Sequence, residues 1–150
     1  SIFATEYFES DKITPIDKKG HIIVCGYSEL GKRVANRLYR DDKSFVIISD
    51  NLQHVLQARN NGYMAYFGHL EKPQVQESLK VDEANSIIIT LNNISKKRLI
   101  CEAILKHKKD AKIVLKINTF SEKKEFEDLD IYNYVHAHNK IASLLVKKSI

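Results

Sequence analysis

The chain has 150 residues, of which 43% are hydrophobic and 29% are charged, and its formal net charge is +5. This length fits one domain that buries roughly 70% of its unfolded surface, and the composition excludes a disordered or low-complexity protein. No apolar run approaches the roughly 18 residues that a membrane span needs, and no signal-peptide pattern appears. We therefore expect a soluble, cytoplasmic chain, or the soluble part of a membrane protein.

The basic residues and the two cysteines indicate no special chemistry. Lysine and arginine are scattered in small groups with acids between several of them, which favours solvated faces over a nucleic-acid surface. Cys25 lies in an apolar run and Cys101 in a helical pattern, and no Cys/His spacing is typical of a metal site. We expect both thiols to be reduced core residues.

Apolar runs and helical periodicities alternate along the chain. Residues 1–20 are mixed and are broken at Thr14-Pro15 and at Gly20, which indicates an arm or short helix followed by a linker. Short apolar runs predict strands at 21–25, 45–49, 63–67, 86–91, 112–117 and 132–136. Helical spacing predicts helices from Leu30 to before Asp41, at about 52–60, 71–79, 94–107 and 119–128, and around 141–145.

Several of the predicted strands are apolar on both faces, as in Ile87-Ile88-Ile89. Such strands are typical of a parallel sheet that helices cover on each side. Strands that alternate with helices predict right-handed crossovers. The sequence thus predicts an α/β, Rossmann-like, doubly wound fold with a mainly parallel six-stranded sheet.

The stretch GYSELG, residues 26–31, has the first and last glycines of the dinucleotide-binding motif G-x-G-x-x-G. Gly26 permits a tight strand-to-helix turn, and Gly31 permits close packing of the helix on the sheet. The helix start then offers free amides and a positive dipole end to a phosphate. Ser28 replaces the middle glycine, so a mononucleotide such as AMP or ADP and the dinucleotide NAD both remain candidate ligands. The alternative is a Rossmann-like turn that has no ligand.

Asp50 ends the second predicted strand, where an acid accepts hydrogen bonds from ribose hydroxyls and repels a 2′-phosphate, so NADP is not expected. The alternative is that Asp50 only caps the next helix. We expect an adenine nucleotide, AMP, ADP, ATP or NAD(H), without catalytic residues or a bound metal. The predicted cofactor-binding residues are Gly26, Tyr27, Ser28, Glu29, Leu30, Gly31, Asp50, Asn51, Gly68, His69 and Thr90.

Four stretches in order resemble the RCK domain, also called KTN or TrkA-N, which is the cytoplasmic module of potassium channels and transporters. HIIVCGYSELGKRVANRL resembles the family's first strand, turn and helix, and FVIISD resembles its second strand with a terminal acid. The stretch from YMAYFGH to TLNN resembles the third-strand unit and the strand after it. The last stretch, which begins AKIVLKINTF, resembles the fifth strand and the closing strand and helix. The resemblance covers about residues 20–150.

The resemblance implies a cytoplasmic, ligand-sensing domain of a potassium channel in the inner cell membrane, and not an enzyme. Such domains form homodimers, often within a larger gating ring, and their ligand shifts the conformation that acts on the pore. Residues 1–20 would be the arm toward the pore, and residues 21–150 the Rossmann-like lobe with its closing helix. The regulatory domain of a K+ efflux antiporter or K+ uptake system is the alternative within this family.

The chain departs from the calcium-gated members of that family. His69 stands where the family usually has an aspartate after glycine, and Lys116-Ile117-Asn118 stands where those members have acids on the fifth strand. Calcium prefers several carboxylate oxygens, so we expect no calcium at this position.

Other interpretations of the sequence stay open. A small NAD-dependent oxidoreductase would need an acid/base group at the nicotinamide and usually a second domain; a ligand-free assembly domain is the third class. His136 and His138 could share a metal on a strand, although exposed or interfacial histidines fit better. The acidic stretch 122–130 fits a solvated helix face. We expect helix 94–107 to pack on the sheet, and the alternative is that part of this helix contributes to a dimer surface.

Overall fold

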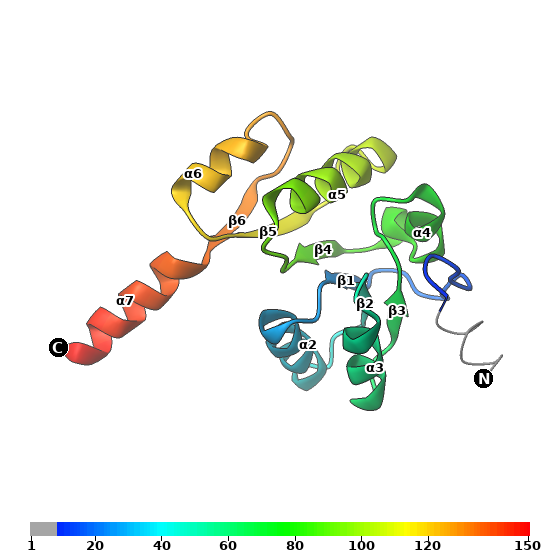
Figure 1. Ribbon diagram of the computed structural model, residues 1–150, viewed down its shortest axis with the longest axis horizontal. Helices are drawn as coiled ribbons and strands as arrows, with labels where there is room; N and C mark the ends of the chain where they lie inside the picture. Colours follow the sequence, from blue (N-terminus) through cyan, green and yellow to red (C-terminus); the bar gives the residue numbers. More distant parts are fainter. Residues whose placement is uncertain (1–8) are drawn as a thin grey trace.

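The computed structural model describes residues 9–150, so the first eight residues of the predicted arm at 1–20 lie outside the described residues. Its centre is a six-stranded sheet in the order β3-β2-β1-β4-β5-β6, and every neighbouring pair is parallel (Figure 1). This topology confirms the predicted doubly wound α/β fold. The strands are β1 (Ile22–Cys25), β2 (Phe45–Ser49), β3 (Ala65–Phe67), β4 (Ser86–Ile89), β5 (Ile113–Ile117) and β6 (Asn133–His136). The helices are α2 (Glu29–Arg40), α3 (Leu52–Asn60), α4 (Pro73–Ser78), α5 (Ile94–His107), α6 (Phe120–Lys123) and α7 (Ala137–Ser149), with short 3-10 helices η1 (Val81–Glu83) and η2 (Lys124–Phe126).

Both faces of the sheet are buried, because successive residues of a strand point to opposite faces. In β2, Phe45 and Ile47 join a core cluster with residues of α2 and α3, whereas Val46 and Ile48 join a second cluster with residues of α4 and α5. Figure 1 shows α2 and α3 on one side of the sheet and α4 and α5 on the other. All of β2 is buried, which explains why its sequence is apolar at consecutive positions.

The turn from β1 to α2 depends on two glycines. Gly26 has a φ of +108°, a conformation that side chains rarely adopt, and a Cβ there would also run into Thr90. A Cβ on Gly31 would lie 2.7 Å from the carbonyl carbon of Gly26, closer than real Cβ contacts. The first turn of α2 therefore packs directly on the chain that leaves β1, as the two glycines predicted.

Two strands, β3 and β4, are each two residues shorter than the sequence predicted. β3 begins at Ala65, because the amide of Tyr63 donates to the carbonyl of Ala58 at the end of α3 instead of joining the sheet. β4 ends at Ile89, although the amide of Thr90 still donates to the carbonyl of Cys25 at 3.0 Å, as the pairing of Cys25 with Ile89 in parallel strands requires. The hydroxyl of Thr90 donates to the same carbonyl at 3.0 Å. Thr90 thereby fastens the end of β4 to the turn that follows β1.

The last two predicted helices also differ in extent. The helix expected at 119–128 is divided into α6 and η2, and α7 begins directly after β6 rather than near Ile141. His136 explains the early start of α7, because its Nδ1 accepts the amide of Asn139 at 3.0 Å and caps the helix. Within residues 9–150, no group of three or more His, Cys, Asp or Glu residues is placed to hold a metal ion.

The described part of the N-terminal segment packs on the domain. Ile16 is buried in the core cluster beside α4, and its amide donates to the carbonyl of Ser78 at 2.9 Å. The assignment of residues 1–20 as an arm toward a pore stays a prediction, but residues 9–20 do not hang free of the lobe.

Cys25 and Cys101 are both buried and free, as predicted. Burial raises the pKa of each thiol to about 12, so both are protonated near neutral pH. None of the helices in the described part of the chain is long and apolar enough to span a membrane.

We expect Gly31→Ala to lower the free energy of unfolding by about 1–3 kcal/mol, because the new methyl group meets the Gly26 carbonyl. Alanine ordinarily stabilises a helix interior relative to glycine by about 1 kcal/mol, so a loss isolates the steric conflict. Urea unfolding measures the change. Asn36→Ala, at an exposed position of the same helix, is the matched control and should be neutral or slightly stabilising. A stabilised Gly31→Ala protein would contradict the close approach.

Candidate functional site

A crevice lies at the carboxyl ends of β1, β2 and β3, beside the start of α5. The strand order reverses here, because β1 lies between β2 and β4, and ligands of doubly wound sheets bind at this point. The crevice is lined by four of the predicted site residues, Gly26, Asp50, Gly68 and His69. Its free volume is only about 20 Å³, room for about one water molecule, so side chains must move before an adenosine enters.

The start of α2 offers the predicted phosphate-binding amides. Ser28 is the N-cap residue with extended backbone, and its side chain makes no capping hydrogen bond. The amides of Glu29, Leu30 and Gly31 belong to the first helical turn, whose N–H groups have no partner within the helix. The side chains of Glu29 and Leu30 are exposed, and Glu29 pairs with Arg33 at 3.0 Å. Phosphate binding here would therefore use backbone groups and the Ser28 hydroxyl.

Tyr27 lies in the predicted turn, but its side chain belongs to the core. It is 1% exposed, and its hydroxyl accepts a hydrogen bond from Asn61 at 2.8 Å. Its ring packs edge-on against Tyr63 at a centroid distance of 6.4 Å. Only the backbone of Tyr27 can contribute to a ligand site at the turn.

Asp50 forms an ion pair with Lys96, which comes from the first turn of α5. Both side chains line the crevice and are about one-third exposed. The helix cap beside them is Asn51, whose side chain accepts the amide of His54 at 3.1 Å. The alternative that Asp50 caps α3 is therefore wrong, because Asn51 is the N-cap residue of this helix. The carboxylate of Asp50 is held at the crevice by this lysine, which occupies part of its capacity to accept hydrogen bonds.

His69 follows Gly68 at the end of β3 and is held by Asp11. The carboxylate of Asp11 accepts the His69 amide at 2.7 Å and faces the ring Nδ1 at 3.0 Å, and Lys72 donates to it at 2.8 Å. Burial of Asp11 acts to raise its pKa, but the hydrogen bonds from Lys72 and His69 outweigh burial and lower the pKa below its usual value. A carboxylate is thus present beside the glycine, but it comes from the N-terminal segment.

Asp11 and Lys96 are charged residues at the site that the sequence did not predict. Asp11 lies 58 residues from His69 in the chain, and no local pattern connects them. Lys96 had a signal, because it follows the helix cap Asn93 by three residues and so projects from the first turn of the helix after β4. A basic residue at that position, opposite the acid that ends β2, faces the switch point of the sheet.

Two lysines lie at the carboxyl end of β5. Lys97 is fully buried and donates to the Glu122 carboxylate at 2.6 Å and to the Lys116 carbonyl at 3.0 Å. Burial and the neighbouring Lys97 lower the pKa of Lys116, whose ammonium donates to the side-chain oxygen of Asn92. A divalent cation at this end of β5 would meet the ammonium group of Lys116, so the expected absence of calcium stays a prediction with an electrostatic reason.

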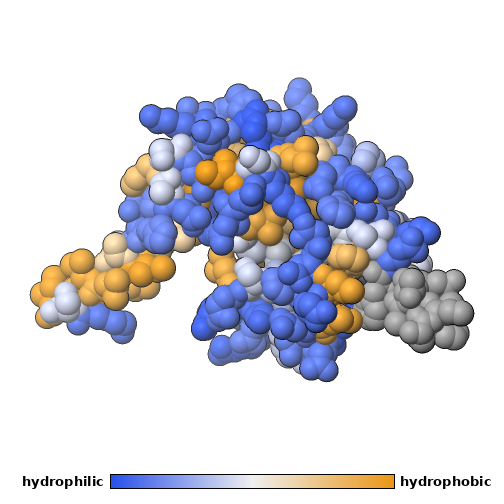
Figure 2. Space-filling view, in the orientation of Figure 1, coloured by the Kyte–Doolittle hydropathy of each residue, from blue (hydrophilic) through white to orange (hydrophobic). Residues whose placement is uncertain are grey.

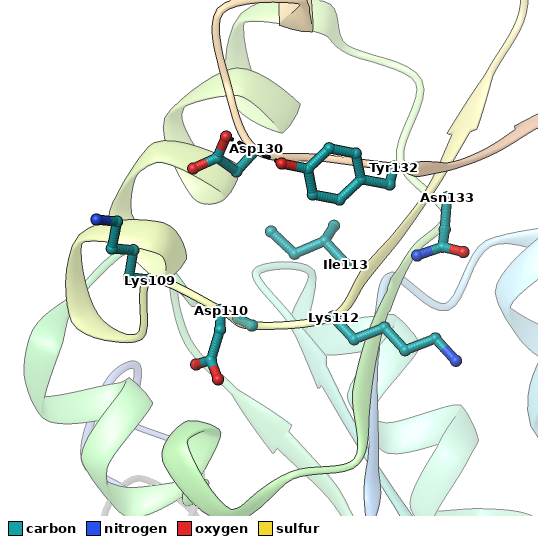
Figure 3. Close-up of a pocket in the computed structure, with 8 residues that line it drawn as sticks. Lys109, Asp110, Lys112, Ile113, Asp130, Tyr132 and Asn133 are labelled. Carbon is teal, nitrogen blue, oxygen red and sulfur yellow. Dashed lines mark hydrogen bonds between the residues drawn. The ribbon is translucent and has the colours of Figure 1, made fainter.

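A larger hollow of about 600 Å³ lies at the opposite end of the sheet, at the amino ends of β5 and β6 (Figure 3). Tyr132 borders it, and its hydroxyl donates to Asp130 at 3.2 Å. Ligands of parallel sheets bind at the carboxyl ends of the strands, so this hollow is not the candidate site.

Comparison with known sequences decides the family. The TrkA-N domain matches residues 22–137, which is more than half of the chain. The chain belongs to the TrkA-N family. The resemblance that the sequence indicated is therefore confirmed.

Two relatives are named as membrane transport proteins. A 77-residue stretch of this TrkA-N chain is 34% identical to Probable potassium channel protein 2 of Methanocaldococcus jannaschii, which covers 49% of this chain and 22% of that protein. An 88-residue stretch is 25% identical to a protein named as a cation/proton antiporter, YbaL of Escherichia coli, which covers 59% of this chain and 16% of that protein. The matched stretches span less than a quarter of either relative.

Solved structures share the TrkA-N fold at low sequence identity. The TrkA-N domain of the inner membrane protein ybaL from Escherichia coli has a TM-score of 0.80 at 19% identity and covers 88% of this chain and 98% of that one. The GsuK channel bound to NAD has a TM-score of 0.74 at 19% identity, and the match covers 85% of this chain and 23% of that one. Kef CTD from Shewanella denitrificans in its AMP-bound form has a TM-score of 0.72 at 18% identity, and the match covers 83% of this chain and 75% of that one.

We expect Lys97→Met in this TrkA-N domain to lower the free energy of unfolding by about 3–5 kcal/mol, because Glu122 would be left buried without its partner. The double variant Lys97→Met/Glu122→Leu should recover much of this loss, since no unpaired charge remains. Lys106→Met, at an exposed position of α5, is the control and should change the free energy by less than about 0.5 kcal/mol. Equal losses in the single and double variants, measured by urea unfolding, would contradict a buried ion pair.

Proposed function

We propose that this TrkA-N chain is the cytoplasmic ligand-sensing domain of a potassium channel, and that it binds an adenine nucleotide in the crevice between β1, β2 and β3. The observation that carries the proposal is that Asp50 and the glycine turn at 26–31 lie at one switch point of a parallel sheet. This pairing supplies a carboxylate for ribose hydroxyls and helix amides for phosphate. The AMP-bound Kef CTD and the NAD-bound GsuK channel support an adenine ligand.

Binding would begin with the exchange of one ion pair for ligand contacts. The ammonium of Lys96 leaves Asp50, and the ribose hydroxyls donate to the freed carboxylate. Because Lys96 remains on the first turn of α5, its charge stays close to the crevice and favours a phosphorylated ligand over a neutral nucleoside. AMP, ADP, ATP and NAD(H) all carry this combination of ribose and phosphate.

The bound nucleotide would act on the pore by shifting a conformational equilibrium. It biases gating only to the extent that it binds one conformation of the domain more tightly than the other. In this role residues 1–20 are the arm toward the membrane pore. The 25% identity to YbaL favours a cation/proton antiporter as the second candidate for the attached membrane protein.

The closing helix α7 supports a homodimer. No residue of α7 is buried, and Ile141, Leu144, Leu145 and Val146 are each more than half exposed. Figure 2 shows this apolar surface along the helix, which extends away from the body of the domain. Exposed apolar surface that is continuous along one element is typical of a protein interface. A second copy of the chain is the partner that we propose, within a larger gating ring of the attached channel.

The nucleotide site is tested by two variants that break the same ion pair with opposite expected effects. Asp50→Asn removes the ribose acceptor and should weaken AMP binding, whereas Lys96→Met frees Asp50 and should tighten binding of neutral adenosine by up to about fivefold. Calorimetric titration measures both affinities. A saturating ligand at about 100 times its Kd stabilises the folded wild-type chain by about 2.7 kcal/mol, which a thermal shift detects.

Asp110→Asn, at the far end of the sheet, is the control for charge loss and should leave AMP binding unchanged. Weaker binding of neutral adenosine in both Asp50→Asn and Lys96→Met would mean that the ion pair only supports the structure. A wild-type chain that binds no adenine nucleotide would overturn the proposed function.

The dimer is tested at the centre of the exposed apolar face of α7. We expect the wild-type chain to sediment as a dimer and Leu145→Asp to sediment as a monomer, because a carboxylate cannot be buried unpaired in an apolar interface. Lys148→Gln, on the same helix, is the matched control and should remain dimeric. A wild-type chain that stays monomeric at high concentration would contradict this assignment of α7.

A further inference from the structure

Asp11 attaches the N-terminal segment to the wall of the crevice. Its carboxylate accepts the His69 amide at 2.7 Å and the Lys72 ammonium at 2.8 Å, and both of its oxygens lie about 3 Å from Nδ1 of His69. The side chain is 13% exposed, so these contacts form in a largely covered place. The Ser10 hydroxyl lies 3.4 Å from the same ring nitrogen.

The backbone around Asp11 is built for this contact. The amide of Asp11 donates to the carbonyl of Phe67, the last residue of β3, at 3.0 Å. Gly68 leaves the space, since a Cβ there would lie 3.0 Å from the Asp11 carboxylate and 3.2 Å from its amide. Asp11 itself has a φ of +68°, a left-handed conformation that costs a non-glycine residue about 1 kcal/mol and that aspartate tolerates better than most. The surrounding contacts hold it there.

The segment continues from this point into the core. The hydroxyl of Ser78, at the end of α4, donates to the carbonyl of Ile13 at 3.0 Å, and the amide of Ile16 donates to the carbonyl of Ser78 at 2.9 Å. The side chain of Ile16 is 5% exposed in the core cluster that contains α4 and α5. Residues 11–16 therefore form a continuous strap from the end of β3 across the end of α4.

The residues that Asp11 holds also line the crevice. Gly68 and His69 contact Asp11 on one side and border the proposed nucleotide site on the other. A change in the position of either residue therefore alters the contacts with the strap and the contacts with a ligand in the crevice. Lys72 adds charge to the anchor without lining the crevice.

We propose that Asp11 is a positioning residue that couples occupancy of the crevice to attachment of the N-terminal segment. The coupling rests on the proposed function, because it needs an adenine nucleotide in the crevice. Linkage requires that it act both ways: the nucleotide holds the strap on the domain, and release of the strap weakens the nucleotide. A segment that leads toward a pore would then transmit binding directly, without passing through a dimer interface.

The test uses the full chain, AMP as the probe, and trypsin cleavage after Lys12, which lies within the strap and is exposed. In the wild-type chain AMP should slow cleavage at Lys12. Asp11→Ala should speed cleavage without AMP and weaken AMP binding by about fivefold or more, the usual lower range of allosteric coupling. Asp11→Asn keeps one oxygen for the His69 amide but loses the charge for Lys72. Its AMP affinity and its cleavage rate should therefore lie between those of the wild-type chain and Asp11→Ala.

Asp17→Ala is the matched control, because it removes a carboxylate from an exposed position of the same segment. It should leave both AMP affinity and cleavage at Lys12 at wild-type values. Circular dichroism and urea unfolding confirm that each variant is folded before it is compared, and Asp11→Asn serves if Asp11→Ala unfolds.

The outcomes separate the two proposals. A wild-type chain that binds AMP, with unchanged affinity in the Asp11 variants or with cleavage at Lys12 that AMP does not alter, would overturn the coupling alone. A wild-type chain that binds no adenine nucleotide would overturn the proposed function and the coupling with it.

Discussion

The contact between the first turn of α2 and the end of β1 determines where the candidate site lies. Gly31 rests against the Gly26 carbonyl because neither residue has a side chain, so the helix starts directly over the edge of the sheet. Thr90 closes the same turn from β4 through its two hydrogen bonds to Cys25. The helix amides, the acid after β2 and the glycine after β3 consequently share one edge of the sheet.

The sequence predicted the sheet and this edge because both depend on local patterns. Strands such as β2 are apolar at consecutive positions, and only a sheet covered on both faces accounts for that. Gly26 and Gly31 have the spacing of a strand-to-helix turn, and the observed turn uses both as predicted. The predicted ends of elements were less accurate, since Tyr63 bonds to the end of α3 instead of joining β3, a contact that no periodicity encodes.

The side-chain partners at the site could not be predicted in the same way. Asp50 was expected at the crevice, but its lysine partner comes from α5, and the pairing depends on how β2 and β4 flank β1. His69 appeared as a departure from the family pattern, whereas the structure places a carboxylate beside it from Asp11, far away in the chain. The side chain of Tyr27 lies in the core, because its ring fills space between aromatic residues that only the folded chain brings together.

The burial of Cys25 gives the domain a built-in reporter. Its thiol borders the crevice, is 5% exposed, and has a pKa raised by burial to about 12, so it is protonated and shielded from electrophiles. Alkylating reagents would therefore reach it only when the crevice widens. The rate at which this sulfur is labelled therefore reports how often the crevice opens, and the measurement needs no introduced probe.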